Sequence, residues 1–284
     1  MKKLAKLIAV MALVPAMLAG CGNSNGASDE TTTAADTDAA AVTEEAGEDN
    51  SLQKVLDSGE FILGLDATFK PMGYTDENDE IVGFDIDCAE EVCARLGVKL
   101  VKQPIDWDTK EQDLDSGKID CIWNGMSINA SRQEVMNLSE PYMKNEMVFV
   151  VAADSTIASQ ADLDGKTVAV QSGSTAQEIL EGAGLNITEN ALATNVECLQ
   201  QLELNLVDAV FMDSVVANYD IKESGKDYVL LSDGLEEEEY AIGFRKNDQA
   251  LRDKVQQTLS EMKADGKLGE ISEKWFGSDI TTVQ

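Results

Sequence analysis

Two stretches of this chain, far apart in sequence, repeat one order of predicted elements. Leu114–Asn124 runs from a helix through a turn into Ile-Asp-Cys-Ile and a polar tip, and Leu202–Asp213 runs likewise through Val-Asp-Ala-Val to an acidic tip. Strands and helices also alternate around both stretches, which predicts an α/β fold with mostly parallel sheets. Open α/β sheets bind ligands at the carboxyl ends of their strands. We therefore expect two open α/β sheets that face each other across a cleft.

The first of these tips leads into a segment suited to hold a carboxylate. An apolar strand at Ile119–Ile122 is expected to run into a polar loop, Asn124–Ser127, before a helix that carries Arg132. Asn129 or Ser131 could cap this helix, and Ser131 with a Glu three residues later fits a capping box, so both starts stay open. Loop amides, a helix N-terminus and a guanidinium together attract an anion. The alternative is an ordinary strand–loop–helix connection with a surface Arg.

Residues 1–20 have the pattern of an export signal. Three lysines precede an apolar run, Leu7–Met17, that is too short to span a bilayer. The Leu-Ala-Gly-Cys that follows, ending at Cys21, resembles the lipobox of bacterial lipoproteins. This resemblance implies that Cys21 carries acyl chains such as palmitate, which would anchor the protein to the outer face of the cell membrane. The alternative is a plain secretory signal with an incidental Cys.

Residues 21–50 are expected to form an acidic, disordered tether. After Cys21 they contain no aromatic and no basic side chain, so they cannot bury enough apolar area to become ordered. A flexible segment of this length has a root-mean-square reach of roughly 30 Å. The folded body is therefore expected to begin near Ser51.

Composition excludes several classes of function. The chain has 53 acidic and 22 basic residues and a formal charge of −31, which disfavours nucleic acid as a partner. We attribute the acidity mainly to a solvated, self-repelling surface. The chain has no His and no metal-site spacing, so neither a metal nor another cofactor is expected. The four Cys of the body, at positions 88, 93, 121 and 198, are expected to be packed thiols.

Four stretches, in this order and spacing, resemble the polar amino acid receptors of ATP-binding-cassette (ABC) uptake systems, extracellular solute-binding protein family 3. They are Ile81–Ala89 (IVGFDIDCA), Asn124–Arg132 (NGMSINASR), Val168–Ala176 (VAVQSGSTA) and Lys274–Gly277 (KWFG). The resemblance spans about residues 51–277. It implies the type II periplasmic binding protein fold, with two lobes joined by two hinge strands. Lobe 1 would comprise residues 51–145 and 241–284, and lobe 2 residues 146–240.

The resemblance also implies a ligand site between the lobes. Arg132, the Ser127 amide and Thr175 match the family's pocket for the ligand carboxylate, whereas Asp213 and the Gly125 carbonyl match the pocket for its α-ammonium. Around the ligand side chain, Phe69 and Trp107 match the aromatic positions, although core packing is an alternative for each. The full expected set is Asp66, Phe69, Trp107, Asn124, Gly125, Met126, Ser127, Arg132, Gln171, Ser174, Thr175 and Asp213.

The chemistry of these positions gives an expected ligand class. Asp66, Asn124 and Gln171 match positions that read the ligand side chain, which suggests a polar or cationic amino acid. However, Asn124-Gly125 departs from the Ser-rich version found in some receptors for basic amino acids, which argues against a basic ligand. An Arg on one lobe and an Asp on the other would grip a zwitterion only when the cleft is shut, so binding would drive closure.

The expected function is capture of a polar amino acid and its delivery to the permease of an ABC transporter, by a monomer and without catalysis. An enzyme is one rival, because dehydratases related to these receptors exist. Without His, such an enzyme would need an acid or base such as Asp66 or Asp213. A surface amino acid sensor is the other rival. The sequence does not name the amino acid or the permease.

Overall fold

The computed structural model describes residues 49–231, 233 and 236–284. The expected signal peptide, Cys21 and all but the last two residues of the expected tether lie outside this range. Those two residues, Asp49 and Asn50, lead into the first helix, and Asp49 accepts hydrogen bonds from the backbone of Ser51 and Ala250. The described residues form one compact unit. Within the described residues, no helix is long and apolar enough to cross a membrane.

Helices and strands alternate along this unit, as expected. The helices are α1 (Ser51–Ser58), α2 (Phe84–Leu96), α3 (Lys110–Asp115), α4 (Ala130–Val135), α5 (Thr175–Gly182), α6 (Asn195–Glu203), α7 (Ser214–Ser224), α8 (Gln249–Ala264) and α9 (Lys267–Phe276), with 3₁₀ turns η1 (Trp107–Thr109) and η2 (Gln160–Leu163). The strands are β1 (Glu60–Leu65), β2 (Thr68–Phe69), β3 (Gly73–Thr75), β4 (Ile81–Val82), β5 (Lys99–Pro104), β6 (Cys121–Ser127), β7 (Met136–Leu138), β8 (Met143–Ala152), β9 (Thr167–Gln171), β10 (Thr188–Leu192), β11 (Ala209–Asp213), β12 (Tyr228–Leu230) and β13 (Glu236–Arg245).

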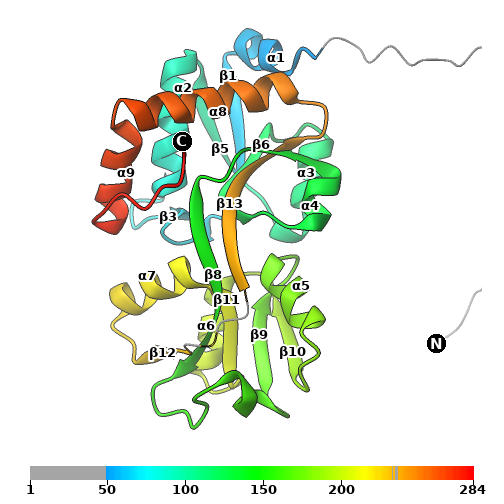
Figure 1. The fold of residues 1–284 in the computed structure, drawn as a ribbon, viewed down its shortest axis with the longest axis vertical. Coiled ribbons are helices and arrows are strands. Elements are labelled where there is room, and N and C mark those ends of the chain that lie inside the picture. Colours follow the sequence, from blue (N-terminus) through cyan, green and yellow to red (C-terminus); the bar gives the residue numbers. More distant parts are fainter. Residues whose placement is uncertain (1–48, 232, 234–235) are drawn as a thin grey trace, which may run out of the picture. The chain divides into compact units, whose positions relative to one another are not determined.

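The unit has two α/β lobes joined by two long strands, β8 and β13 (Figure 1). In one lobe β1 pairs in parallel with β5 and β6, and in the other β9 pairs in parallel with β10 and β11. The crossing strands pair antiparallel with each other, from Glu236 opposite Met147 to Tyr240 opposite Met143. This pairing joins the two expected sheets into one hydrogen-bonded ladder of order β10-β9-β11-β8-β13-β6-β1-β5. The fold class is confirmed; the residue bounds of the lobes stay a prediction.

Strand β6 corrects one expectation. Asn124–Ser127 is not a loop, because these residues are buried and belong to the strand that begins at Cys121. The pairing with β13 is irregular there: Met126 lies opposite Ala241, but Ile122 lies opposite Gly243. Three residues of β6, 123–125, thus lie opposite a single residue of β13, which is a bulge, and they leave the regular ladder.

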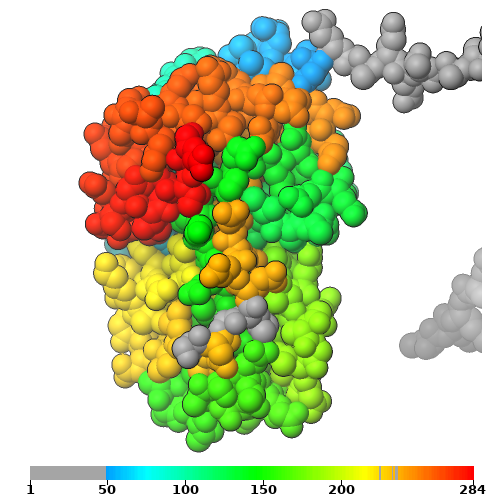
Figure 2. Space-filling view, in the orientation of Figure 1, coloured from blue at the N-terminus to red at the C-terminus, as the bar shows by residue number. Residues whose placement is uncertain are grey.

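The C-terminal helices α8 and α9 pack back on the lobe that contains α2, with an apolar stripe of α8 in the core. Leu251, Val255, Leu259 and Met262 of that stripe are all buried. Figure 2 shows α8 and α9, in orange and red, over this end of the unit, with atoms of the crossing strands exposed between the lobes.

Two of the stretches that carry the resemblance meet at this interface. The rings of Phe84 and Phe276 lie 5.3 Å apart, and the indole Nε1 of Trp275 donates to Asp87 over 2.7 Å. Lys274 forms an ion pair with the same carboxylate. Asp87, the second acid of the Gly-Phe-Asp-Ile-Asp stretch, therefore links α9 to α2.

The core is apolar and includes the cysteines. Cys88, Cys93, Cys121 and Cys198 are all buried as free thiols, in agreement with the expectation. In the second lobe the rings of Phe149 and Phe211 pack with centroids 4.5 Å apart on the paired strands β8 and β11. Full burial of each such ring stabilises the fold by about 1.5–3 kcal/mol.

Candidate functional site

A small cavity lies where the carboxyl ends of strands from both lobes converge. Its lining residues are Asp66, Phe69, Trp107, Asn124, Gly125, Ser127, Arg132, Met147, Gln171, Ser174, Thr175 and Asp213. The structure thus brings together all of the expected site residues except Met126. It adds Met147, which lies on the crossing strand β8. Met147 was not predicted, because nothing in the sequence distinguishes it from the other apolar residues of this strand.

Met126 lies elsewhere, in an apolar cluster with Ile122 and Met136. Its neighbours Gly125 and Ser127 line the cavity, and successive side chains of a strand point to opposite faces. Asn124 reaches the cavity as well because Gly125 has a positive φ of 55°, which breaks the alternation within the bulge. Met126, one of the expected ligand-binding residues, therefore does not line this cavity.

Arg132 is held rigidly at one side of the cavity. Asn129 caps α4 by accepting from the backbone N–H of Arg132 over 2.8 Å, which decides between the two possible caps. The guanidinium donates to the Ser127 carbonyl over 2.7 Å and lies 6.0 Å from the centre of the Trp107 ring. Among the described residues it has no other hydrogen-bond partner. Its remaining N–H groups are free to bind an anion, and an Arg stays charged even when buried.

Asp213 lies at the end of β11, on the other lobe from Arg132. It is 7% exposed, and its Oδ1 accepts from Asn145 Nδ2 over 2.9 Å and from the Tyr240 hydroxyl over 2.7 Å. Burial raises the pKa of Asp213, although the bond from Tyr240 and the charge of Arg132 oppose the rise. A buried carboxylate in this state is stabilised by a cation, such as an ammonium group, in the cavity.

Polar side chains gather at a third side of the cavity. Asp66 follows β1, and its Oδ1 accepts from the backbone N–H and the hydroxyl of Thr68. Its Oδ2 accepts from Gln171 Nε2 over 2.8 Å, while Asn124 Oδ1 accepts from the Asp66 backbone N–H. Asn195 in turn donates to Gln171 Oε1 over 3.1 Å. These bonds fix an array of donors and acceptors beside the aromatic ring of Phe69.

The N-terminus of α5 completes the lining. Ser174 caps the helix by accepting from the backbone N–H of Gln177, and its hydroxyl donates to the Gln171 carbonyl over 2.7 Å. Thr175, the first helical residue, accepts from Asn129 Nδ2 over 3.2 Å. The positive end of the helix dipole therefore lies on the same cavity as Arg132 and favours a negative group there.

The lobes also touch at the rim of the cavity. Lys110 Nζ donates to the Gly173 carbonyl over 2.8 Å, and Glu178 accepts from Asn129 over 2.9 Å and from Ser131 over 3.2 Å. Sequence reasoning missed Lys110 and Glu178, because their roles depend on how the two lobes meet. The contacts hold the lobes together around the cavity.

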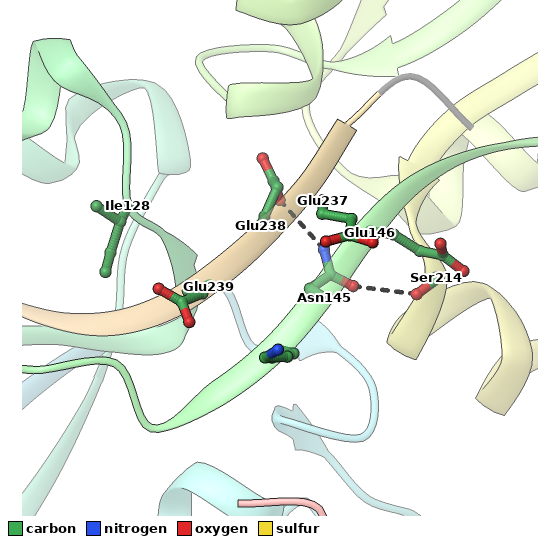
Figure 3. Close-up of a pocket in the computed structure, with 8 residues that line it drawn as sticks. Ile128, Asn145, Glu146, Ser214, Glu237, Glu238 and Glu239 are labelled. Atoms are coloured by element: carbon green, nitrogen blue, oxygen red, sulfur yellow. Dashed lines mark hydrogen bonds between the residues drawn. The ribbon is translucent and has the colours of Figure 1, made fainter. Parts of the chain in front are cut away.

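A larger hollow lies outside the cavity, along the crossing strands (Figure 3). It is lined by Ile128, Lys144, Asn145, Glu146, Ser214, Glu237, Glu238 and Glu239. Its surface is dominated by carboxylates, so it would repel an anionic group. In the described part of the chain, no cluster of His, Cys, Asp or Glu has the arrangement to hold a metal ion. The cavity between the lobes, with its buried Arg and Asp, is therefore the candidate site.

Comparison with known proteins agrees with this geometry. The family model for bacterial extracellular solute-binding proteins, family 3, matches residues 61–278. The L-cystine-binding protein TcyA of Bacillus subtilis is 30% identical over 284 residues, with 99% of each chain covered. Among solved structures, an ABC uptake transporter substrate-binding protein from Streptococcus pneumoniae with bound histidine is 39% identical at a TM-score of 0.80, covering 83% of this chain and 99% of that one. Tv2483 bound to L-arginine is 30% identical at a TM-score of 0.80, with 83% and 98% covered. The chain belongs to family 3 of the bacterial extracellular solute-binding proteins.

Proposed function

We propose that this protein captures a free polar amino acid in the cavity between its lobes and delivers it to the permease of an ABC transporter. One observation carries the proposal: Arg132 and Asp213, of opposite charge and from opposite lobes, are both buried on the same small cavity. This pair matches the two charges of an amino acid zwitterion.

The site offers groups for each end of such a ligand. Arg132, the Ser127 amide and Thr175 would bind the α-carboxylate, where the guanidinium can form two parallel bonds. Asp213 would take the α-ammonium, with help from the Gly125 carbonyl. A charge-assisted bond of this kind is about twice as strong as a neutral one, and the surrounding burial strengthens it further.

The side-chain end of the site favours a polar ligand. Phe69 and Trp107 would flank the ligand side chain, while Asp66, Asn124 and Gln171 supply polar atoms. Asn124 Nδ2 is buried without a hydrogen-bond partner among the described residues, and an apolar ligand side chain would leave it unpaired, at a cost of about 1–3 kcal/mol. The relatives are named for cystine or solved with histidine or arginine, all polar amino acids.

Ligand binding would stabilise the closed arrangement of the lobes. The ligand carboxylate would contact mainly one lobe and its ammonium the other, so the full set of contacts would form only when the cleft is shut. A ligand shifts a conformational equilibrium by as much as its affinities for the two states differ. Closure would then be the signal that the transporter reads.

Catalysis is the weaker alternative. Asp66 and Asp213 are the carboxylates that line the cavity, and both accept hydrogen bonds from neighbouring side chains that hold them in place. This arrangement suits recognition of fixed charges better than proton transfer. Incubation with amino acids, followed by mass spectrometry, would show product from an enzyme and unchanged amino acid from a binding protein.

Location and partners complete the proposal. The lipobox-like sequence ending at Cys21, outside the described residues, would anchor the protein to the outer face of the membrane beside its permease. The protein would act there as a monomer. Co-purification with a permease separates a transport role from that of a surface sensor, which would not require one.

A thermal-shift screen tests the central proposal. The twenty amino acids, cystine and ornithine are each added to the purified protein, and stabilising compounds are then titrated by calorimetry. Ligand binding to the folded state raises the melting temperature by mass action, so at least one polar amino acid should do so. If none did, the proposed function would be wrong.

A further inference from the structure

A buried acid, Asp85, stabilises the bulge in β6. Within the bulge, the backbone N–H of Gly125 turns away from β13 and donates to Asp85 Oδ2 over 2.7 Å. The hydroxyl of Tyr142 lies beside both groups, 3.2 Å from the Gly125 nitrogen and donating to Asp85 Oδ2 over 3.1 Å. Asp85 thus satisfies a backbone group that the bulge removes from the ladder.

Gly125 itself has little freedom at this position. Its φ of 55° is a conformation that side chains disfavour, and an added Cβ would lie 2.9 Å from Phe69 and 3.2 Å from Met72 and Tyr240. Gly125 also lines the cavity between the lobes. A small rotation of its peptide would therefore change the wall of the site directly.

Burying the carboxyl group of Asp85 in the core is energetically unfavourable. Asp85 is fully buried, and its Oδ1 has no hydrogen-bond partner among the described residues. Burial raises the pKa of Asp85 to about 7, against the bonds from Gly125 and Tyr142 and the effect of the nearby Trp123 indole. An apolar side chain would avoid this cost, and of the groups that Asp85 contacts only Gly125 lines the cavity.

The neighbouring acid of the same helix acts differently. Asp87 is bound to Lys274 and Trp275 of α9, away from the cavity. The two acids of the Gly-Phe-Asp-Ile-Asp stretch therefore have separate tasks: Asp87 faces the C-terminal helix and Asp85 faces the bulge.

We propose that Asp85, which does not itself line the cavity, is a positioning residue for amino acid binding: by holding the Gly125 peptide, it sets the wall of the site against which the ligand lies. This inference rests on the proposed function. It extends the site to the residue behind the cavity wall.

Calorimetric titration of three variants tests the proposal, with L-cystine, L-histidine and L-arginine as probes. Asp85→Ala removes the acceptor for Gly125, so we expect affinity to fall by about tenfold or more. Asp85→Asn keeps a side-chain oxygen for that N–H, so its affinity should stay within about threefold of the wild type. Asp87→Ala is the matched control: it should lower the melting temperature without ligand and leave affinity unchanged.

Tyr142→Phe supplies a second, milder test, because it deletes only the hydroxyl that steadies Asp85 under Gly125. We expect a loss of affinity of about two- to fivefold. If Asp85→Ala does not fold, this variant decides, and unchanged affinity overturns the proposal. Unchanged affinity in a folded Asp85→Ala also overturns it, as does a loss in Asp85→Asn equal to that in Asp85→Ala. Failure of the wild type to bind any probe or any other amino acid would instead contradict the proposed function.

Discussion

Gln171 and Asp66 join the two lobes through one hydrogen bond, 2.8 Å long, from Gln171 Nε2 to Asp66 Oδ2. The bond crosses the cavity, since Gln171 ends β9 of one lobe and Asp66 follows β1 of the other. Lys110 and Gly173 make a second bond across the cleft, at its rim. Each of these bonds has one charged partner and contributes about 1.5–3 kcal/mol. The lobes are therefore in contact around the cavity, and a few such hydrogen bonds must break to admit a ligand.

Arg132→Ala should weaken amino acid binding by roughly 2–5 kcal/mol, because the ligand carboxylate would lose its charged partner in a desolvated cleft. Calorimetry with the best ligand from the screen measures this loss. Arg252→Ala is a suitable control, because Arg252 pairs with Glu140 and Asp253 and does not line the cavity. A loss of less than threefold in Arg132→Ala would contradict the assigned role.

Asp213→Asn should weaken ligand binding without lowering the stability of the ligand-free protein. The ligand ammonium would lose a negative partner, so affinity should fall by about tenfold or more. Without ligand, the variant should be at least as stable as the wild type at pH 7.5, because burial raises the pKa of Asp213 and its charge is costly there. Asp208→Asn, in the turn before the same strand, should leave affinity unchanged. Intact affinity in Asp213→Asn would rule out the ammonium site.

Much of the fold could be predicted from the sequence, because periodic apolar residues determine it. The helix–turn–strand stretches Leu114–Asn124 and Leu202–Asp213 end in strands β6 and β11 as expected, although β11 begins only at Ala209. Helix α1 was not predicted, since Val55 is its only buried apolar side chain. The bulge in β6 was also missed. The Asn124-Gly125 pair is typical of a loop, and only the pairing with β13 shows that β6 continues through it.

The candidate site was predictable to a similar extent and for a different reason. Arg132, Asp213 and most of the other lining residues come from stretches that match family motifs, so their positions followed from the resemblance. Residues that reach the site by tertiary contact alone carried no such signal. Met147 lines the cavity from a crossing strand, and Asp85 acts from behind its wall, so both required the structure.

Cys21→Ala should release the protein from the membrane. If the lipobox resemblance is correct, the acyl chains on Cys21 are the anchor, and the variant lacks the thiol that would carry them. Fractionation of expressing cells, with detection of the protein in pellet and supernatant, measures the change. Cys198→Ala should stay with the membrane, since Cys198 is a buried thiol of the core. Retention of Cys21→Ala in the membrane pellet would contradict the lipid anchor.

Glu178→Ala should speed ligand release with little change in the association rate. Glu178 accepts hydrogen bonds from Asn129 and Ser131 across the mouth of the cleft, and these bonds form only when the lobes meet. Because the groups are exposed, we expect the dissociation rate to rise by only about two- to fivefold, measured by stopped-flow fluorescence. Glu181→Ala, one turn along α5, should not change it, since Glu181 bonds to Gln177 on its own helix. Equal rates in both variants would show that the rim contacts do not restrain opening.

The ligand-free protein should become less stable as pH rises from about 4 to about 7. Asp85, Asp213 and Glu238 all have raised pKa values, chiefly because they are buried, and that of Asp85 is raised to about 7. In this range the folded state therefore holds protons that the unfolded chain has released, so the free energy of unfolding falls as pH increases. Urea unfolding at pH 5 and pH 7.5 measures the difference.

The large negative charge of the chain acts in the same direction, so a variant must separate the two causes. Glu238 accepts hydrogen bonds from Ser127 and Asn145 and lies close enough to Asp213 for the charge of one to raise the pKa of the other. Glu238→Gln removes this buried acid and should flatten the pH dependence, whereas Glu237→Gln, which removes an exposed charge next to it, should not. A slope that both variants reduce equally would assign the effect to net charge. The buried carboxyls around the hinge would then be no more sensitive to pH than the surface.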